Sequence, residues 1–189
     1  WDESKMQKWA HPQTGCSPQF WGRAMGWYAM ALVDVLDFLP ASHQARSWIL
    51  TIFKGMIQAV VQFQDPDTGL WYQVLDRGGS EGNYTEASAS CMFVYALAKG
   101  IRKNYLSAKC LEAAQRGYDG IIEHLVDVDE QGQVNLMMTC AVAGLGGEGQ
   151  RDGSYEYYIS EPIVTNDPKG VGAFLLASIE IERLSKPNG

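Results

Sequence analysis

The stretch SCMFVYALAKGI, residues 90–101, is apolar nearly all the way round a helix. Two other stretches share this character, WYAMALVDVLDFL at 27–39 and VGAFLLASIEI at 171–181. A helix without a polar face has to be covered on both sides. The sequence therefore predicts three buried helices, over about 24–39, 86–103 and 169–184.

Two further helices, predicted over 44–64 and 106–127, carry one apolar stripe and one polar face. Inner and outer helices thus alternate along the chain, which is the pattern of an array of helical hairpins with its inner row sandwiched. We expect 106–127 to be less buried than 86–103 in the folded protein.

A repeated turn separates the hairpins. HPQTG at 11–15 recurs as DPDTG at 65–69 and, in weaker form, as VDEQG at 128–132, each ending in a glycine that tolerates a left-handed backbone. Such arrays stay open as solenoids or close into α/α toroids, and long glycine-rich loops favour closure. We expect an all-α, (α/α)6 toroid-type fold in a single domain over residues 1–189, with about half of the hairpins present.

Composition excludes several classes of partner. The net charge is −7 and the pI is about 4.9, which argues against nucleic acid or an anionic membrane as the main partner. No apolar run approaches the ~20 residues of a membrane span. Four cysteines without C-x-x-C spacing indicate free thiols in a reducing compartment, so we expect a soluble, cytoplasmic protein. The three histidines are scattered, so we expect no zinc or other metal site.

The segment FWGRAMGWYAMALVDVLDFLP, residues 20–40, places aromatic rings and one cation at the mouth of a buried helix. Arg23 and Trp27 are four residues apart and share a helix face, and Trp21 lies just before it. A guanidinium, indole faces and free N–H groups of a first helical turn suit a carboxylate on a sugar ring. Alternatively, the tryptophans anchor the core and Arg23 makes a structural ion pair. Composition alone leaves both interpretations open.

Two later loops carry further candidates. Four glycines cluster at 144–149, where a backbone can approach a ligand closely, but no strand–Lys-Ser/Thr context supports nucleotide binding. The run Tyr-Glu-Tyr-Tyr at 155–158 is interpreted as a packed strand edge. Glu86 and Glu161 are candidates for a pair of glycosidase acids, although their spacing alone does not single them out.

Several motifs together resemble one enzyme family. They are WDES at 1–4, FWGRAMGWYAMALVDVLDFLP at 20–40, NYTEASASCMFVYALAKGI at 83–101, GLGG at 144–147 and RDGSYEYYISEPIVTNDPKGVGAFLLAS at 151–178. In this order they resemble the C-terminal part of the unsaturated rhamnogalacturonyl hydrolases, glycoside hydrolase family 105, which are related to the family 88 unsaturated glucuronyl hydrolases. The resemblance covers essentially the whole chain.

The resemblance implies a six-hairpin (α/α) toroid and an unusual reaction. An acid protonates the C4=C5 vinyl ether of an unsaturated uronic acid, water adds at C5, and the resulting hemiketal opens and releases rhamnose. No cofactor is implied. Among the matched positions, Trp21, Arg23 and Trp27 lie in the pocket with Arg23 near the uronate carboxylate, and Ala143, Gly144 and Gly147 lie at its rim. The family's catalytic aspartate precedes the WDES segment, so no catalytic residue is carried over.

Two functional hypotheses follow. In the first, the chain supplies part of the pocket of a hydrolase that acts on small unsaturated uronyl-rhamnose disaccharides from pectin or rhamnogalacturonan, with a second chain or an N-terminal half completing it. In the second, the chain is a non-catalytic fragment, a sugar-binding or structural helical array. Detectable binding without turnover by this chain alone favours the second hypothesis.

Overall fold

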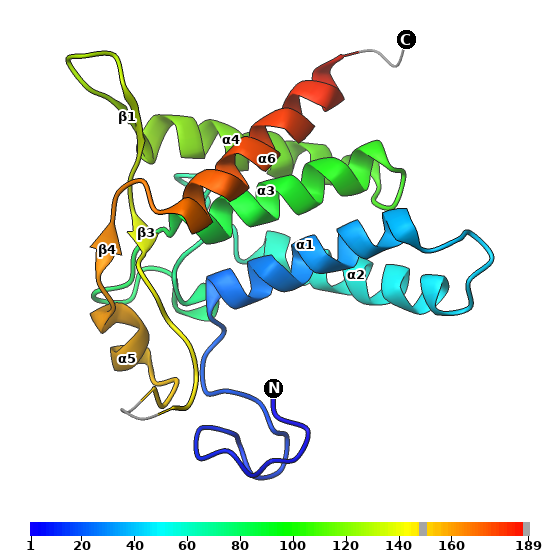
Figure 1. Ribbon diagram of the computed structural model, residues 1–189, viewed down its shortest axis with the longest axis vertical. Helices are drawn as coiled ribbons and strands as arrows, with labels where there is room; N and C mark the ends of the chain where they lie inside the picture. The colour runs from blue at the N-terminus through cyan, green and yellow to red at the C-terminus, as the bar shows by residue number, and fades with distance from the viewer. Residues whose placement is uncertain (148–150, 187–189) are drawn as a thin grey trace.

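A computed structural model describes residues 1–147 and 151–186 (Figure 1). Its six α-helices in this range are α1 (Gly22–Phe38), α2 (Ala45–Gln62), α3 (Ala87–Arg102), α4 (Leu111–His124), α5 (Tyr155–Ser160) and α6 (Pro168–Ser185). Two 3₁₀ turns, η1 (Leu75–Arg77) and η2 (Ala108–Cys110), precede α3 and α4. The strands β1 (Val126–Val128) and β2 (Val134–Leu136) form one antiparallel pair, and β3 (Thr139–Cys140) and β4 (Ile163–Val164) form another.

Helix α3 is the centre of the molecule. All residues from Ala87 to Gly100 are buried, and α1, α4 and α6 all pack against α3 (Figure 1). Helix α4 has only five buried residues, so the expectation that it is less buried than α3 is confirmed. The prediction of three buried helices holds in full only for α3, because eight of 17 residues are buried in α1 and only four of 18 in α6. Helices α1 and α6 are covered on the side that faces α3. Each leaves large apolar side chains exposed elsewhere, namely Trp27, Tyr28, Val35 and Phe38 on α1 and Leu175, Leu176 and Ile179 on α6.

The repeated turns have the backbone that the sequence predicts. Gly15, Gly69 and Gly132 all have φ between 73° and 76°, in the left-handed region that favours glycine. Close helix packing depends on another glycine. A Cβ at Gly26 would lie 2.8 Å from the Cβ of Met92, so α1 approaches α3 at a distance that a larger residue would prevent.

The predicted helix boundaries need correction at two places. The segment 106–127 is not one helix, because η2 precedes α4 and the chain leaves α4 at His124 to form the β1–β2 hairpin around the third repeated turn. The Tyr-Glu-Tyr-Tyr run is not a strand edge but the helix α5. Ser154 caps this helix by accepting a hydrogen bond from the backbone N–H of Tyr157 at 3.1 Å.

The far ends of α1, α3 and α6 are tied by ion pairs. Lys99 of α3 contacts Asp34 at 2.6 Å and Asp37 at 2.8 Å on α1, and Arg102 contacts Glu180 of α6 at 2.5 Å. These contacts fix the three helices relative to one another at the end opposite their N-termini. None of the helices within residues 1–147 and 151–186 combines the length and the apolar character needed to cross a membrane.

Candidate functional site

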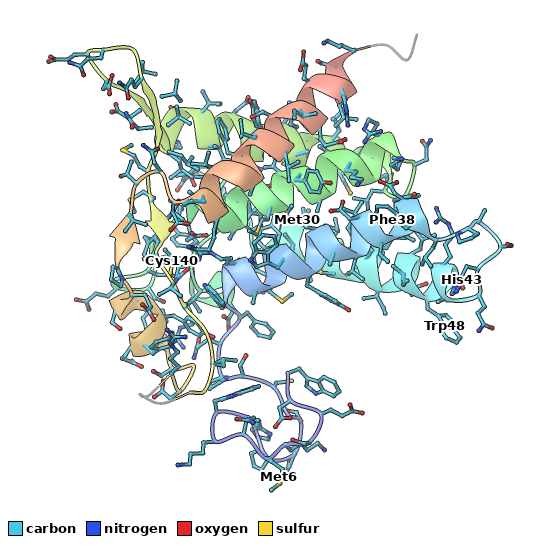
Figure 2. The ribbon with its side chains drawn as sticks, in the orientation of Figure 1. Met6, Met30, Phe38, His43, Trp48 and Cys140 are labelled. Carbon is cyan, nitrogen blue, oxygen red and sulfur yellow. The ribbon has the colours of Figure 1, made fainter. Side chains whose placement is uncertain are left out.

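The N-terminal ends of α1, α3 and α6 meet at strand β3. Arg23 in the first turn of α1 donates a hydrogen bond to the backbone carbonyl of Cys140 in β3, and Glu86 at the N-cap of α3 accepts from the Cys140 N–H at 2.9 Å. A Cβ at Gly170, in the first turn of α6, would lie 2.6 Å from Oγ1 of Thr139. Figure 2 shows Cys140 at this end of the helices, with Met30 further along α1. Three helix N-termini therefore converge on one place. Those of α3 and α6 are capped by the carboxylates of Glu86 and Asp167, whereas α1 has no side-chain cap.

Arg23 is almost fully buried, with 2% of its surface exposed. Its Nε donates to Oγ of Ser88 at 2.7 Å, and its Nη2 donates both to the Cys140 carbonyl and to Oε1 of Glu86, the latter at 3.2 Å. The third nitrogen, Nη1, donates to no acceptor within the described residues. It is also not fully buried, since the fully buried polar atoms that lack a partner do not include it. Of the two interpretations left open by the sequence, the structural ion pair is therefore present, and it leaves Nη1 without a partner among the described residues.

Trp21 lies against this guanidinium. The Arg23 Cζ atom is 5.7 Å from the centre of the indole, and the indole stacks on Tyr158 with ring centres 5.8 Å apart. Its Nε1 donates to Oε1 of Gln73 at 3.1 Å, and the amide nitrogen of Gln73 donates to the Tyr158 carbonyl at 3.2 Å. The Trp21 indole is thus held by Tyr158 on one face and by Gln73 at its Nε1 edge, so its orientation is fixed.

Trp27 is half exposed, one helical turn beyond Arg23. It lines a groove of about 320 Å³ between α1 and α6, together with Met30, Pro168, Lys169, Gly172, Ala173 and Leu176. Lys169 is a cation that sequence reasoning missed. Its Nζ lies 2.8 Å from Asp167, the N-cap of α6, and the Asn-Asp-Pro start of that helix is the signal that could have located it.

The predicted rim residues lie on a separate loop. The backbone N–H of Gly144 donates to the Tyr157 hydroxyl at 3.1 Å, Ala143 is half-buried, and Gly147 is exposed. Gly147 lines a cleft of about 620 Å³, together with Met6, Gln7, Lys8, Trp9, Gly146, Arg151 and Asp152. That lining does not include Trp21, Arg23 or Trp27. Gly149, the last glycine of the predicted cluster, is outside the described residues.

The rim loop and the indole of Trp21 are linked through α5. Tyr157 holds Gly144, its ring centre is 5.1 Å from that of Tyr158, and Tyr158 stacks on Trp21. Burial and the neighbouring Glu161 carboxylate raise the pKa of Tyr157 to about 12, so its hydroxyl stays protonated near neutral pH. Helix α5 thus positions both parts of the predicted site.

The carboxylates considered as glycosidase acids do not form a pair in one site. The Glu86 side chain has no exposed surface, and both of its oxygens accept hydrogen bonds. Glu161 is the C-cap residue of α5 and lies next to the Tyr157 side chain. Within the described part of the chain, His, Cys, Asp and Glu side chains do not gather into a group able to hold a metal ion.

Comparisons with known proteins identify the family. The model of Glycosyl Hydrolase Family 88 matches residues 1–185. The 24.9 kDa protein in the picA locus of Rhizobium radiobacter is 43% identical over 189 residues, which is 95% of this chain and 79% of that protein. The unsaturated 3S-rhamnoglycuronyl hydrolase of Formosa agariphila is 27% identical over 168 residues, covering 88% of this chain and 40% of that enzyme.

Among solved structures, the C. acetobutylicum glycoside hydrolase from family 105 is 51% identical, with a TM-score of 0.94 over 97% of this chain and 51% of that one. The chain therefore spans about half the length of that structure. The fold class expected from the sequence is confirmed, since the mostly helical structure is that of the helical toroid enzymes of families 88 and 105. The chain belongs to glycosyl hydrolase family 88 and is similar to the enzymes of family 105.

Proposed function

We propose that this chain supplies part of the substrate pocket of a hydrolase that acts on unsaturated uronyl-rhamnose disaccharides from pectin or rhamnogalacturonan. Family membership supports hydrolysis of an unsaturated uronate-containing sugar, and one relative, from Bacillus subtilis, is an unsaturated rhamnogalacturonyl hydrolase that is 34% identical over 85 residues. The observation that carries the proposal is that Nη1 of Arg23 has no partner in the described part of the chain and belongs to a guanidinium beside a fixed indole, where three helix N-termini converge.

In this proposal, each residue of the pocket has one task. Nη1 of Arg23 donates to the uronate carboxylate, because Nε and Nη2 are already engaged inside the protein. Trp21, and Trp27 one turn further along α1, flank the flattened ring. Such contacts orient the ring for protonation of the vinyl ether at C4 and addition of water at C5.

The proton donor comes from outside the described residues in this scheme. The two carboxylates at the helix N-termini are both occupied, Glu86 by Arg23 and backbone N–H groups, and Asp167 by Lys169 and its own helix cap. We propose that residues 1–189 form a single domain that is the C-terminal part of a toroid. The exposed apolar side chains of α1 and α6 support a complementary set of helices, from an N-terminal half or a second chain, that covers them and brings the acid.

Calorimetry with an unsaturated galacturonyl-rhamnose disaccharide tests the pocket. Trp27→Ala should weaken binding about 3- to 10-fold, since aromatic contacts contribute about 0.5–1.5 kcal/mol. The control is Trp48→Ala, which removes a more exposed tryptophan from the outer helix α2 and should leave affinity unchanged. Equal affinity in Trp27→Ala and the unaltered chain would remove Trp27 from the pocket.

A second candidate function is a non-catalytic sugar-binding or structural array. The engagement of both carboxylates at the helix N-termini favours it. Incubation of the chain with the disaccharide, followed by an assay for released rhamnose, separates the two. Turnover by this chain alone excludes the non-catalytic function. Turnover that appears only when an acid-bearing second chain is added supports the pocket function, and binding without turnover in both conditions supports the non-catalytic one.

Light scattering tests the proposed complementary helices. If the α1 and α6 faces need covering, the isolated chain should form dimers or larger species, and a compact monomer would contradict this.

We also propose a cytoplasmic location, which the four free cysteines support.

A further inference from the structure

Glu86 takes no part in the proposed reaction, yet both of its carboxylate oxygens accept hydrogen bonds. It is fully buried at the N-cap of α3 and accepts from the backbone N–H of Ala89 at 2.6 Å, closing the first turn of that helix. It also accepts from the Cys140 N–H at 2.9 Å and from Oγ of Ser88 at 2.7 Å. The remaining donor is Nη2 of Arg23. One carboxylate therefore joins α1, α3 and β3.

The same contacts fix the plane of the Arg23 guanidinium. Glu86 accepts a hydrogen bond from Nη2, and the Cys140 carbonyl also accepts from Nη2. Ser88 accepts from Nε, and its own hydroxyl donates to Glu86. A guanidinium is planar and rigid, so bonds to two of its nitrogens determine where the third points. Rotation about the last side-chain bonds of Arg23 would break all of these contacts at once.

We infer that Glu86 is a positioning residue, which holds Arg23 so that its free Nη1 faces the ligand carboxylate beside Trp21. The inference rests on the proposed function of Arg23. Glu86 itself does not touch the ligand, since its oxygens are occupied and it has no exposed surface. Its contribution is that Arg23 is already ordered before the ligand arrives.

Glu86→Gln tests the role because it keeps the shape and the acceptor for the helix cap while it removes the charge that orients Nη2. The expected result is a loss of affinity for the unsaturated galacturonyl-rhamnose disaccharide of about 10- to 100-fold, the scale at which a misplaced binding group acts. Glu180→Gln is the matched control. Glu180 of α6 is also buried and also pairs with an arginine, Arg102 of α3, but this pair lies at the end of the helices away from their N-termini. That variant should lose stability and keep its affinity.

A double-mutant cycle separates positioning from a general structural effect. If Glu86 acts through Arg23, Glu86→Gln should have no further effect on affinity in an Arg23→Met background. The methyl ester of the disaccharide should also bind Glu86→Gln and the unaltered chain equally. A loss of affinity that persists in the Arg23→Met background, or for the ester, would overturn the positioning role. Absence of any binding by the unaltered chain would instead count against the proposed function.

A measurement without ligand tests the inference whether or not the unaltered chain binds the disaccharide. In ¹⁵N NMR, with the signal assigned by its absence in Arg23→Lys, the Nε–H of Arg23 should be rigid and slow to exchange. It should become mobile in Glu86→Gln and stay rigid in Glu180→Gln. A mobile Arg23 side chain in the unaltered protein, or one equally rigid in Glu86→Gln, would refute the role of Glu86.

Discussion

Replacing Arg23 by methionine should destabilise the fold through Glu86. The substitution leaves a carboxylate with no exposed surface and no counter-charge. Removing one partner of a buried ion pair costs about 3–5 kcal/mol. The positive N-terminal end of α3 still faces this carboxylate, and such an end contributes about 1 kcal/mol in favourable cases. The expected loss in the free energy of unfolding is therefore about 2–4 kcal/mol.

Thermal unfolding followed by circular dichroism measures this loss. A chain of this length shifts its Tm by about 2–4 °C for each kcal/mol, so Arg23→Met should lower Tm by about 4–16 °C. Adding Glu86→Gln to Arg23→Met should recover part of the loss, because the buried group is then neutral and its one remaining oxygen keeps one of the two backbone donors. The double variant thus regains stability without regaining the cation.

Arg46→Met is the matched control for this rescue. Arg46 donates to the carbonyls of Leu36 and Leu39 and to the Tyr105 hydroxyl, so its loss strands no carboxylate. That variant should lose only about 1–2 kcal/mol, and Glu86→Gln should not rescue it. The reasoning is refuted if Arg23→Met melts with the unaltered protein, or if the double variant is no more stable than the single one.

Three further outcomes follow from the same structure. Lys99→Met should lower the free energy of unfolding in urea by about 2–3 kcal/mol, because a buried cation that joins two helices is lost. Lysine partners lower the pKa of Asp37, and Arg102 lowers that of Glu180 against the opposing effect of burial. Stability from these groups is present above their unfolded pKa of about 4 and should fall as the pH drops below it, which urea titrations at several pH values would show. Gly55→Ala should raise Tm, since nothing lies within 4 Å of the added methyl group and alanine favours helix by about 1 kcal/mol. Gly120→Ala should lower Tm, because its methyl group would collide with the backbone carbonyl of Thr68.

Helix periodicity predicted the core because it is a local property. The unbroken apolar pattern around SCMFVYALAKGI corresponds to α3, which is buried along nearly its whole length. The same pattern in α1 and α6 predicts coverage on both sides, but it does not say which element provides it. In the described structure α3 and α2 pack against α1, and α3 and α4 pack against α6, and each of the two helices still carries exposed residues such as Phe38 and Leu175.

Short elements were predicted less well because tertiary contacts decide them. Three-residue strands on either side of the turn at 128–132 are too short to show a period of two. The aromatic residues of α5 favour a strand by propensity, yet the Ser154 cap and the stacking of Tyr158 on Trp21 outweigh that preference. The serine three residues before Tyr157 is the local signal that could have indicated a helix.

Arg23 shows why the sequence left two interpretations of the site open. The helix-face relation to Trp27 is visible over four residues, but the partner of the ion pair lies 63 residues away in the chain and no spacing rule reaches it. The two interpretations also do not exclude each other. A guanidinium has three nitrogens, and here two are used to hold the side chain while the third remains available. A structural ion pair is therefore what gives Arg23 a single defined direction from which to bind an anion, and the binding role depends on the structural one.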